Sequence, residues 1–443
     1  MYRKELLGEV SDPEVQAYTS SMKDDVSIAK EVVEIMMAHV RELSERGLMP
    51  SDAAAKVTQV LTELLADPSP LLEIEAEDIH EALEKYLANM VGSDAGWVGL
   101  GRSRNDHVAA ALRSRMLKSV NELVKAIRGL REALIRKALE HLDTLMPAFT
   151  HLQPAQVTTL AHYLAWVEES LATYEGVLRF VANEVLSESP LGSGACVTTN
   201  APLDRESLAK KAGFTRIVTN SIRGAGGRDF LMITSAILTC LSVTLSRFAE
   251  DLVVFTTPQF NYLDVPQDFL ATSSLMPHKK NQVVAEIIRS WGGESIGHLT
   301  SLLAIVKGVP SGYSLDLQEA NKHAIKLVDR TLETVKVLRK LVEGIEPIKG
   351  RLLEDVEKYP ILATDYAELI SLKRGVPYRE AHALVAKAVK EFRGVNELYG
   401  ILAKYLGHTL SPGESIVKPH PGSPNPEKLG QHLRERLREL AGT

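Results

Sequence analysis

Apolar side chains recur at helical spacing along much of this chain. Between residues 106 and 146 they fall every three or four positions, which is the pattern of one face of an α-helix. These positions are Val108, Leu112, Met116, Val120, Leu123, Ile127, Leu130 and Leu134. Pro147 is expected to end this helix, because proline cannot donate the backbone hydrogen bond that a helix requires.

A second run of apolar residues, over 155–187, alternates between spacings of four and three. Its positions are Leu160, Leu164, Val167, Leu171, Tyr174, Leu178 and Val181. This heptad pattern predicts a helix that packs against other long helices. Alternating patterns typical of strands are almost absent, and further helices are expected over 229–255, 281–307 and 316–345.

Five long helices predict an all-α protein with a helix-bundle core. We expect this core, residues 107–346, to be flanked by two smaller helical domains, residues 1–106 and 347–443. Three segments between the long helices are rich in Gly, Pro, Ser or Asn, namely 188–204, 213–227 and 256–280. Loops of this length are uncommon unless they have a function, so these segments are candidates for one.

Composition narrows the class of protein. The 443 residues are 45% apolar and 24% charged, as in ordinary soluble proteins, and a net charge of −6 disfavours non-specific nucleic-acid binding. The two cysteines cannot form a disulfide framework and suit a reducing compartment such as the cytoplasm.

The charged N-terminal residues lack the apolar run of a signal peptide. The longest uncharged stretch, 230–246, is shorter than the ~20 residues that span a bilayer, so it predicts a buried bundle helix rather than a membrane segment.

Polar residues cluster at four places where long helices are expected to begin. The clusters are GRSRNDH at 101–107, THLQPAQ at 150–156, ATSSLMPHKKN at 271–281 and GVPSGYSLDLQE at 308–319. Asn105, Asp106 or His151 could simply be helix-cap residues. Four such clusters nevertheless exceed what capping requires.

The cluster at 271–281 combines a pair of serines with Lys279 and Lys280, just before a helix N-terminus. Free backbone N–H groups and positive charge favour an anion at such a place. It is therefore either a mobile flap that closes on a carboxylate and activates a serine, or a solvated basic loop.

No metal or nucleotide signature is present, and no cofactor is expected. His80 and Glu84 stand four residues apart on a predicted helix and could hold a metal, but we interpret them as part of a polar helix face. Gly99 and Gly101 lack the third glycine and the preceding strand of a dinucleotide-binding turn.

Together these motifs resemble the argininosuccinate lyases, within the fumarase/aspartase superfamily. SSLMPHKKN is similar to the signature of the whole superfamily, while GRSRND, PSGYSLDLQE and ATDYAELISLKRGVPYREAHALV, residues 363–385, are similar to the argininosuccinate members. The similarity runs from about residue 18 to 420. It implies an all-α fold and reversible cleavage of argininosuccinate to arginine and fumarate, the last step of arginine biosynthesis.

That reaction is a β-elimination, which needs a base for a weakly acidic C–H and donors where the carboxylate gains charge. The resemblance assigns Ser273 as the base, ionised with the help of Lys279. It assigns His151 as a second acid or base, oriented by Glu286, and leaves open which group protonates the leaving nitrogen. The implied substrate-binding residues are Ser21, Asn105, Thr150, Asn281, Tyr313 and Gln318. Arg104 and Arg228 are added as carboxylate partners.

Several positions depart from the family pattern. The lysine common three residues after the glutamine is Asn321 here, with Lys322 next to it. One residue along a helix turns a side chain by about 100°, so this carboxylate contact is in doubt. Other departures are Leu100, Glu81, Leu83 and Gln282.

Helix length predicts how the site is assembled. A single helix over 106–146 would be about 60 Å long, which separates Asn105 from His151 by more than one substrate can bridge. The helix over 281–307, about 40 Å long, likewise separates Ser273 from Tyr313. Active sites shared among chains are therefore expected, and the resemblance implies a homotetramer.

Two alternatives remain. One is another fumarate-releasing lyase of the superfamily, such as an adenylosuccinate lyase or an aspartase-like enzyme. The other is a non-catalytic structural homologue, although such a protein often loses site residues that are present in this chain.

Overall fold

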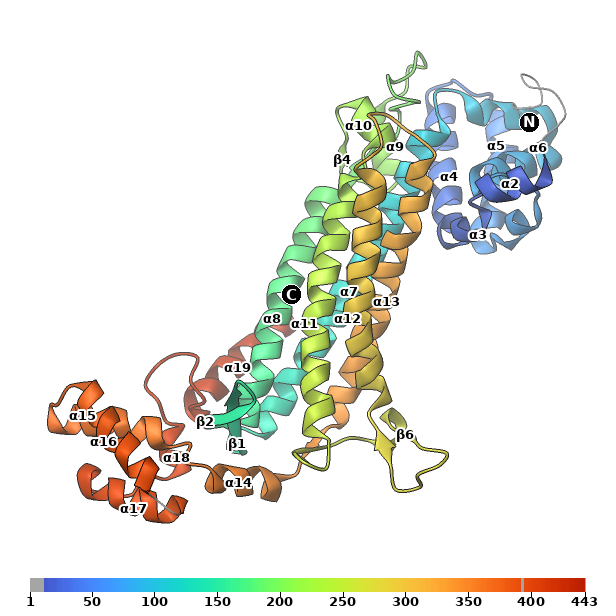
Figure 1. The fold of residues 1–443 in the computed structure, drawn as a ribbon. Helices are drawn as coiled ribbons and strands as arrows, with labels where there is room; N and C mark the ends of the chain where they lie inside the picture. The colour runs from blue at the N-terminus through green and yellow to red at the C-terminus, as the bar shows by residue number, and fades with distance from the viewer. Residues whose placement is uncertain (1–11, 392–393, 443) are drawn as a thin grey trace. The chain divides into compact units, whose positions relative to one another are not determined.

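The computed structural model describes residues 12–391 and 394–442, which fold mainly into α-helices (Figure 1). The chain forms two compact units. Unit 1 comprises Met1–Val124, Gly176–Cys240 and Glu294–Leu332. Unit 2 comprises Lys125–Glu175, Leu241–Gly293 and Glu333–Thr443. The predicted division into three domains remains a prediction.

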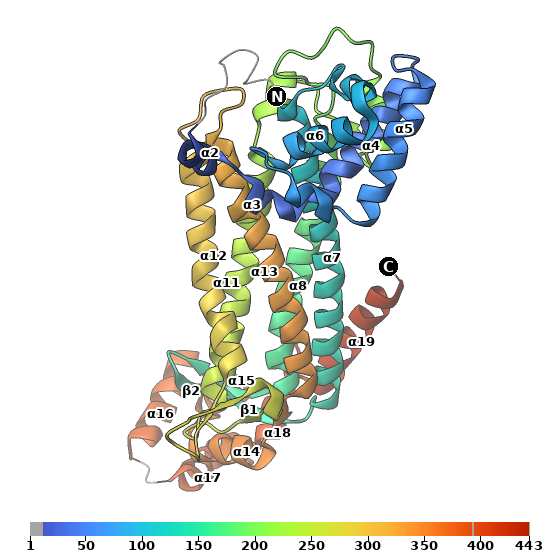
Figure 2. The ribbon, with the colours of Figure 1, turned by 90° about the vertical axis from the view of Figure 1, so that its right-hand side faces the viewer.

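Five long helices dominate the fold, as the sequence predicts (Figure 2). They are α7 (Arg104–Glu140), α8 (Leu160–Phe180), α11 (Asp229–Phe255), α12 (Val283–Val306) and α13 (Asp316–Gly344). Each boundary between the two units falls inside one of these helices, so every long helix contributes to both. All the predicted apolar positions of α7 are buried except the half-buried Val108, because a period of 3.6 residues keeps them on one face.

Unit 1 carries the N-terminal helices α2 (Pro13–Thr19), α3 (Met22–Asp25), α4 (Ala29–Glu45), α5 (Ser51–Ala66) and α6 (Ile79–Val91). Short 3₁₀ helices span Val26–Ile28, Ser69–Glu73 and Gly92–Gly99, and a π-helical turn spans Val181–Leu186. Beyond it lie α9 (Arg205–Lys211), α10 (Ser221–Gly226) and the parallel pair β3 (Glu188–Ser189) and β4 (Arg216–Ile217). Ile35 of α4, Ala110 of α7 and Leu208 of α9 share one apolar core, which fixes these helices to the start of α7.

Unit 2 carries three short antiparallel strand pairs. They are β1 (Leu145–Thr150) with β2 (Gln153–Thr159), β5 (Leu263–Asp264) with β8 (Glu346–Pro347), and β6 (Ala271–Thr272) with β7 (Lys280–Asn281). A 3₁₀ turn spans Gln267–Phe269.

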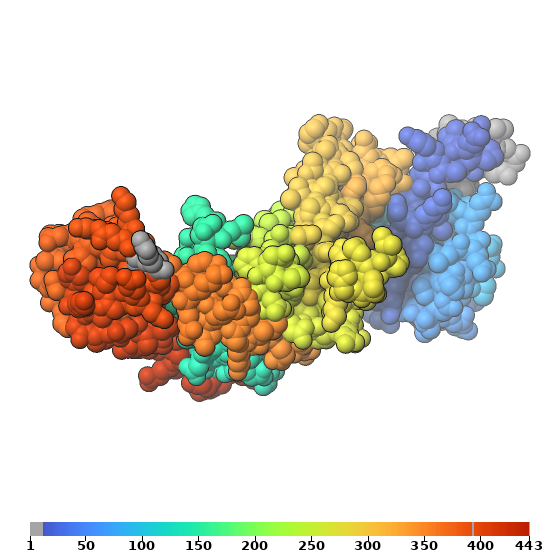
Figure 3. Space-filling model, turned by 60° about the horizontal axis from the view of Figure 1, so that its bottom comes forward, coloured from blue at the N-terminus to red at the C-terminus, as the bar shows by residue number. Residues whose placement is uncertain are grey.

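The C-terminal part of unit 2 is helical. Its helices are α14 (Lys349–Lys358), α15 (Ala363–Arg374), α16 (Tyr378–Glu391), α17 (Val395–Leu406), α18 (Pro412–Ser415) and α19 (Pro426–Gly442). Helices α15, α16 and α17 gather into a lobe, coloured orange to red (Figures 1 and 3). Its core includes the stacked rings of Tyr366 and Tyr399, whose centroids are 5.5 Å apart.

The prediction of helix over 155–187 was wrong at its N-terminal end, whereas the helix continues as the π-helical turn to Leu186 at the other. Residues 153–159 form β2, and α8 begins only at Leu160. The expected stop at Pro147 was also wrong, since α7 already ends at Glu140 and Pro147 lies in β1. The physical reason is that β1 and β2 satisfy one another's backbone groups across a tight turn, a pairing that a helical apolar pattern conceals.

Among the described residues, α11 alone is long and apolar enough to span a membrane by length and composition. Half of its most apolar window is buried inside the protein. This agrees with the prediction of a buried bundle helix over 230–246.

Candidate functional site

The predicted site residues divide cleanly between the two units. Those in unit 1 are Ser21, Arg104, Asn105, Arg228, Tyr313 and Gln318. Those in unit 2 are Thr150, His151, Ser273, Lys279, Asn281 and Glu286. Each group is described by itself below.

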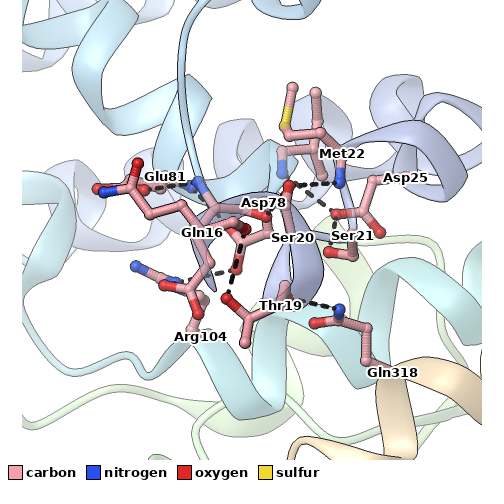
Figure 4. Close-up of polar contacts among 12 residues, drawn as sticks. Gln16, Thr19, Ser20, Ser21, Met22, Asp25, Asp78, Glu81, Arg104 and Gln318 are labelled. Carbon is pink, nitrogen blue, oxygen red and sulfur yellow. Dashed lines mark hydrogen bonds and ion pairs between the residues drawn. The ribbon is translucent and has the colours of Figure 1, made fainter. Parts of the chain in front are cut away.

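In unit 1, side-chain hydrogen bonds join the turn between α2 and α3 to α3 and to α13 (Figure 4). The Oγ of Ser21 donates a hydrogen bond to Asp25 Oδ2 at 2.7 Å. The Nε2 of Gln318, in the first turn of α13, donates to the carbonyl of Thr19 at 3.1 Å. Residues 299 positions apart in the sequence therefore meet here. We call this region, with Asp78, Arg104, Arg228 and Tyr313, the unit 1 cluster.

Two carboxylates of this cluster were missed by the sequence reasoning. Asp78 caps α6 by accepting the N–H of Glu81 at 2.7 Å, and its other oxygen pairs with Arg104 at 2.9 Å. Asp78 with Glu81 three residues later is a capping pattern that could have been found. Asp25 accepts a second hydrogen bond, from the N–H of Ile79 at 3.2 Å. No local sequence pattern predicts this contact, because the two residues are 54 positions apart.

The two carboxyl groups differ in their electrostatic surroundings. Burial raises the pKa of Asp25 to about 6, and the hydrogen bonds from Ser21 and Ile79 offset only part of this effect. The charge of Asp78 raises the pKa further. Asp25 forms no ion pair with any described residue, whereas Asp78 is neutralised by Arg104.

Arg228 is a buried cation in the same cluster, with 2% of its surface exposed. Its Nη1 donates to the carbonyl of Gly227 at 3.1 Å, while Nε and Nη2 have no hydrogen-bond partner in the described structure. Burial lowers the pKa of Arg228 to about 10. Its guanidinium carbon lies 6.0 Å from the centre of the Tyr313 ring. Unpaired N–H groups of a buried cation are costly and favour an anionic ligand.

The backbone around Arg228 and Tyr313 is closely packed. A Cβ atom at Gly226 would lie 1.9 Å from the carbonyl oxygen of Gly312. Only glycine permits this approach, which fixes the turn before Tyr313 against the end of α10. Burial also raises the pKa of the Tyr313 hydroxyl, an effect that the charge of Arg228 opposes.

The start of α7 shows that Asn105 and Asp106 are not the helix cap. The Oγ of Ser103 accepts the N–H of Asn105 at 3.2 Å and takes that part. Asp106 is fully buried and accepts the N–H groups of Ser103 and Gly194 at 3.1 and 2.9 Å. Burial raises the pKa of Asp106 to about 6. The amide of Asn105 donates to the carbonyl of Ala195 at 3.2 Å, so both residues hold the loop after β3 against α7.

In unit 2, His151 lies at the tip of the β1–β2 hairpin and not at a helix start, which corrects the prediction. His151 and Leu152 form a two-residue turn with φ values of 56° and 57°. Two positive φ angles are typical of a type I′ turn, where Asn and Gly are preferred. Both side chains are exposed, and His151 has no hydrogen-bond partner among the described residues. The turn therefore presents the imidazole to its surroundings at the cost of backbone strain.

Ser273 begins the loop of the β6–β7 hairpin. Its Oγ accepts the N–H groups of Leu275 at 3.3 Å and of Met276 at 3.0 Å. The N–H of Lys279 in turn donates to the carbonyl of Met276 at 3.0 Å, which closes the loop. Two N–H donors on one hydroxyl oxygen favour its anionic form. The expected loop before a helix is thus confirmed, but its ends pair as strands.

The four predicted catalytic side chains do not contact one another within one chain, as far as the described residues show. In the described part of unit 2, no hydrogen bond or ion pair links His151, Ser273 or Lys279 to Glu286. Glu286 is exposed in the first turn of α12. Among the described residues there is also no group of three His, Cys, Asp or Glu side chains that could hold a metal.

Asn321 of α13 stands where the family pattern has a lysine, and the structure shows how Asn321 and its neighbour Lys322 are placed. Lys322 forms an ion pair with Glu319 on the exposed side of the helix. Asn321 is half-buried, and its Oδ1 has no partner in the described structure. Lys322 is therefore occupied in this chain by an ion pair of its own helix.

A cavity of about 890 Å³ lies in unit 2 between β1, α8, α11 and α19. None of the predicted site residues lines it. Its polar groups contact one another: the Tyr163 hydroxyl donates to Asp251 at 3.0 Å, and Arg247 lies over the ring of Trp166 at 5.8 Å. We therefore place the candidate site on the two groups above and not in this cavity.

Comparison with known families and proteins identifies the family of the chain. A family model described as lyase matches residues 7–297, and one described as argininosuccinate lyase C-terminal matches residues 360–398. The chain is 44% identical to an argininosuccinate lyase of Pyrococcus furiosus over 440 residues, covering 99% of this chain and 95% of the relative. An argininosuccinate lyase of Pyrobaculum islandicum is 42% identical over 424 residues, covering 96% and 95%.

Solved structures show the same fold. EDDS lyase in complex with formate matches with a TM-score of 0.83 at 26% identity, covering 94% of this chain and 87% of that one. A class II fumarase from Schistosoma mansoni matches in fold, with a TM-score of 0.74 at 16% identity and coverage of 89% and 91%. The predicted all-α, fumarase/aspartase-like fold is confirmed. By sequence, motif and fold, the chain belongs to the argininosuccinate lyase family.

Proposed function

We propose that this chain cleaves argininosuccinate to L-arginine and fumarate, as a carbon–nitrogen lyase of arginine biosynthesis in the cytoplasm. The observation that carries the proposal is the 44% identity to an argininosuccinate lyase over 99% of the chain. The oxygen of Ser273, held by two backbone N–H groups in the predicted catalytic loop, supports it chemically.

The proposed elimination begins at Ser273. Its oxygen, as the alkoxide, removes the proton from the carbon beside a substrate carboxylate, and the electron pair moves onto that carboxylate. The pair then returns to form the C=C bond of fumarate while the C–N bond breaks. The leaving guanidino nitrogen takes a proton from His151 or from another acid. Lys279 stabilises the alkoxide, and Glu286 orients His151.

The proposed binding residues of the two units contact different portions of the substrate. Thr150 and Asn281, in unit 2, hold the succinyl carboxylates by hydrogen bonds. Ser21, Asn105, Tyr313 and Gln318, in unit 1, hold the rest of the substrate. Arg104 and Arg228 supply positive charge, although the ion pair with Asp78 already engages Arg104.

We further propose a homotetramer whose active sites combine residues from different chains. α7 is one continuous helix of 37 residues, about 55 Å long, with Asn105 in its first turn and His151 beyond its end. Argininosuccinate is far shorter than this helix. Exposed apolar side chains on α12, at Ile287, Ile296 and Leu303, offer area for helix packing between copies.

The test of the reaction is fumarate release from argininosuccinate. We expect Ser273→Ala to lower kcat by about 10²–10⁴-fold, the range for loss of a general base, while Ser274→Ala on the neighbouring residue serves as the matched control. Adenylosuccinate and aspartate run in the same assay test the alternative lyases. Full activity of Ser273→Ala would remove Ser273 as the base, and cleavage of another substrate alone would refute the proposed function.

The test of the shared site is subunit complementation. Ser273→Ala and His151→Asn chains, each inactive, are mixed in equal amounts under conditions that exchange subunits. If the two residues of one site come from different chains, about one quarter of the sites escape both lesions. No recovery in fully exchanged tetramers would contradict the shared site.

A further inference from the structure

The tip of the β1–β2 hairpin, which carries Thr150 and His151, is weakly held by its own backbone. The strand register shifts between Ala148 and Phe149, so the ladder is irregular just before the tip. Beyond the shift Phe149 faces Pro154, whose nitrogen has no hydrogen to donate. Thr150 and His151 are exposed, so burial of their own side chains does not fix them either. The placement of these two residues therefore depends on contacts made elsewhere in the hairpin.

Phe149, the residue directly before Thr150, anchors the hairpin in a cluster of aromatic rings. Its half-buried ring lies against three others, with centroid separations of 6.2 Å to Phe255, 5.8 Å to Phe260 and 6.2 Å to Tyr262. Those three rings also contact one another, at 5.4 to 6.1 Å. Aromatic pairs at such distances attract one another beyond the area that they bury. We call these four residues the aromatic hub.

Tyr262 is fixed at three points within the aromatic hub, and only 1% of its surface is exposed. Its N–H donates to the carbonyl of Phe255 at 2.8 Å, and its own carbonyl accepts the N–H of Ile348 at 2.8 Å. Its hydroxyl donates to Oδ2 of Asp355, on α14, at 2.7 Å. Burial and the adjacent carboxylate raise the pKa of Tyr262 above its ordinary value, so the hydroxyl stays a hydrogen-bond donor.

Asp355 is held in its turn by Arg351, which precedes it by one turn of α14. The Nη1 and Nη2 of Arg351 donate to the two carboxylate oxygens of Asp355 at 2.9 and 2.8 Å, which makes a bidentate pair. The Nε of Arg351 donates to the carbonyl of Phe260 at 3.1 Å. Helix α14 itself contacts β1 (Figures 1 and 2). A chain of contacts therefore runs from α14 through Tyr262 and Phe149 to the tip of the hairpin.

Resting on the proposed function, we infer that Tyr262 and Asp355 are positioning residues for Thr150 and His151. In this role neither touches the substrate. The hydrogen bond between them fixes the Tyr262 ring, this ring fixes Phe149, and Phe149 holds the next two residues where the reaction requires them. No short motif marks Tyr262 or Asp355, because the segments that meet here are distant from one another in the chain.

Tyr262→Phe tests this role, because it removes the hydroxyl and keeps the ring. Hydrogen exchange of the amides in residues 145–159 of the full-length protein reports how firmly the hairpin is held. We expect this exchange to become at least about tenfold faster, since a hydrogen bond to a buried charged group is lost. We also expect kcat for fumarate release to fall about tenfold, because a 1 Å displacement of a reacting group costs about 10²-fold. KM should change less, since the proposed binding residues of unit 1 are untouched.

Two other changes show whether the hydroxyl acts through its carboxylate. Asp355→Ala, which removes the acceptor, should reproduce both effects, and Asp355→Asn, which keeps an acceptor, should rescue a large part of them. Tyr366→Phe is the matched control, because Tyr366 is also fully buried and its hydroxyl also has a single close partner, the N–H of Leu410 at 2.8 Å. This control should leave kcat and the exchange of the hairpin unchanged.

A double-mutant cycle separates positioning from a general loss of stability. Phe149→Leu removes the ring that transmits the effect, so it should lower kcat and speed hairpin exchange by itself. If Tyr262 acts through Phe149, adding Tyr262→Phe to Phe149→Leu lowers kcat by less than about twofold more. Additive effects would overturn the inference, as would an effect of Tyr262→Phe no larger than that of Tyr366→Phe.

These outcomes are separable from those of the proposed function. Wild-type protein that releases fumarate, with a Tyr262→Phe variant equally active and equally protected, keeps the function and loses the inference. Wild-type protein that releases no fumarate would refute the proposed function, while hairpin exchange in the variants would still decide whether Tyr262 holds Thr150 and His151 in place.

Discussion

Glu168, in the middle of α8, offers the sharpest stability test in unit 2. Its carboxylate is 1% exposed and accepts hydrogen bonds from Arg131 of α7 at 2.8 Å and from Arg436 of α19 at 2.6 and 2.9 Å. One buried anion thus connects three helices. Replacing it by alanine leaves two guanidinium groups without this partner.

The expected loss of stability depends on which partners Arg131 and Arg436 keep after Glu168 is removed. Removing one partner of a buried ion pair costs about 3–5 kcal/mol, because the remaining charge stays buried. Arg131 still has Glu175, and the side chain of Arg436 is 18% exposed and can turn toward water. We therefore expect the lower end, about 3 kcal/mol for Glu168→Ala, which is about a 150-fold change in an equilibrium constant.

Hydrogen exchange of the α19 amides is the assay, since it reports the local opening of that helix. Glu169→Ala is the matched control, because its side chain is 60% exposed and only approaches His432 at 3.5 Å. We expect this control to cost no more than about 0.5 kcal/mol. A change below about 1 kcal/mol for Glu168→Ala, or an equal cost in the control, would refute the reasoning.

Two further predictions concern the β1–β2 turn and the unit 1 cluster. Leu152→Gly should raise the free energy of unfolding by about 1 kcal/mol, because glycine adopts the positive φ of this turn without strain, and an unchanged urea midpoint would argue against strain there. Gly226→Ala should displace the turn before Tyr313 and weaken L-arginine binding, whereas Gly176→Ala, with open space at its Cβ, should not; calorimetry decides between them.

Short motifs predict which residues the candidate site contains, but they do not predict how those residues are arranged. Ser273 and its two N–H donors lie within four residues of one another, so a local pattern contains the whole feature. The contact of Gln318 with Thr19 joins distant segments, and no local pattern encodes it. Asp25 escaped notice for the same reason, since its burial and its bond to Ile79 arise only when α3 meets α6.

The sequence by itself determined the five long helices, because a period of 3.6 residues is a local property that survives in any soluble packing. It also determined the family, through motifs that are contiguous in the chain. Tertiary structure alone decided that residues 145–159 pair as a hairpin, because strand pairing depends on a partner and a turn rather than on apolar spacing. It alone decided that, among the described residues, Asp25 has no ion pair and two N–H groups of Arg228 have no partner, since burial and neighbouring charge are properties of the folded chain and not of any segment.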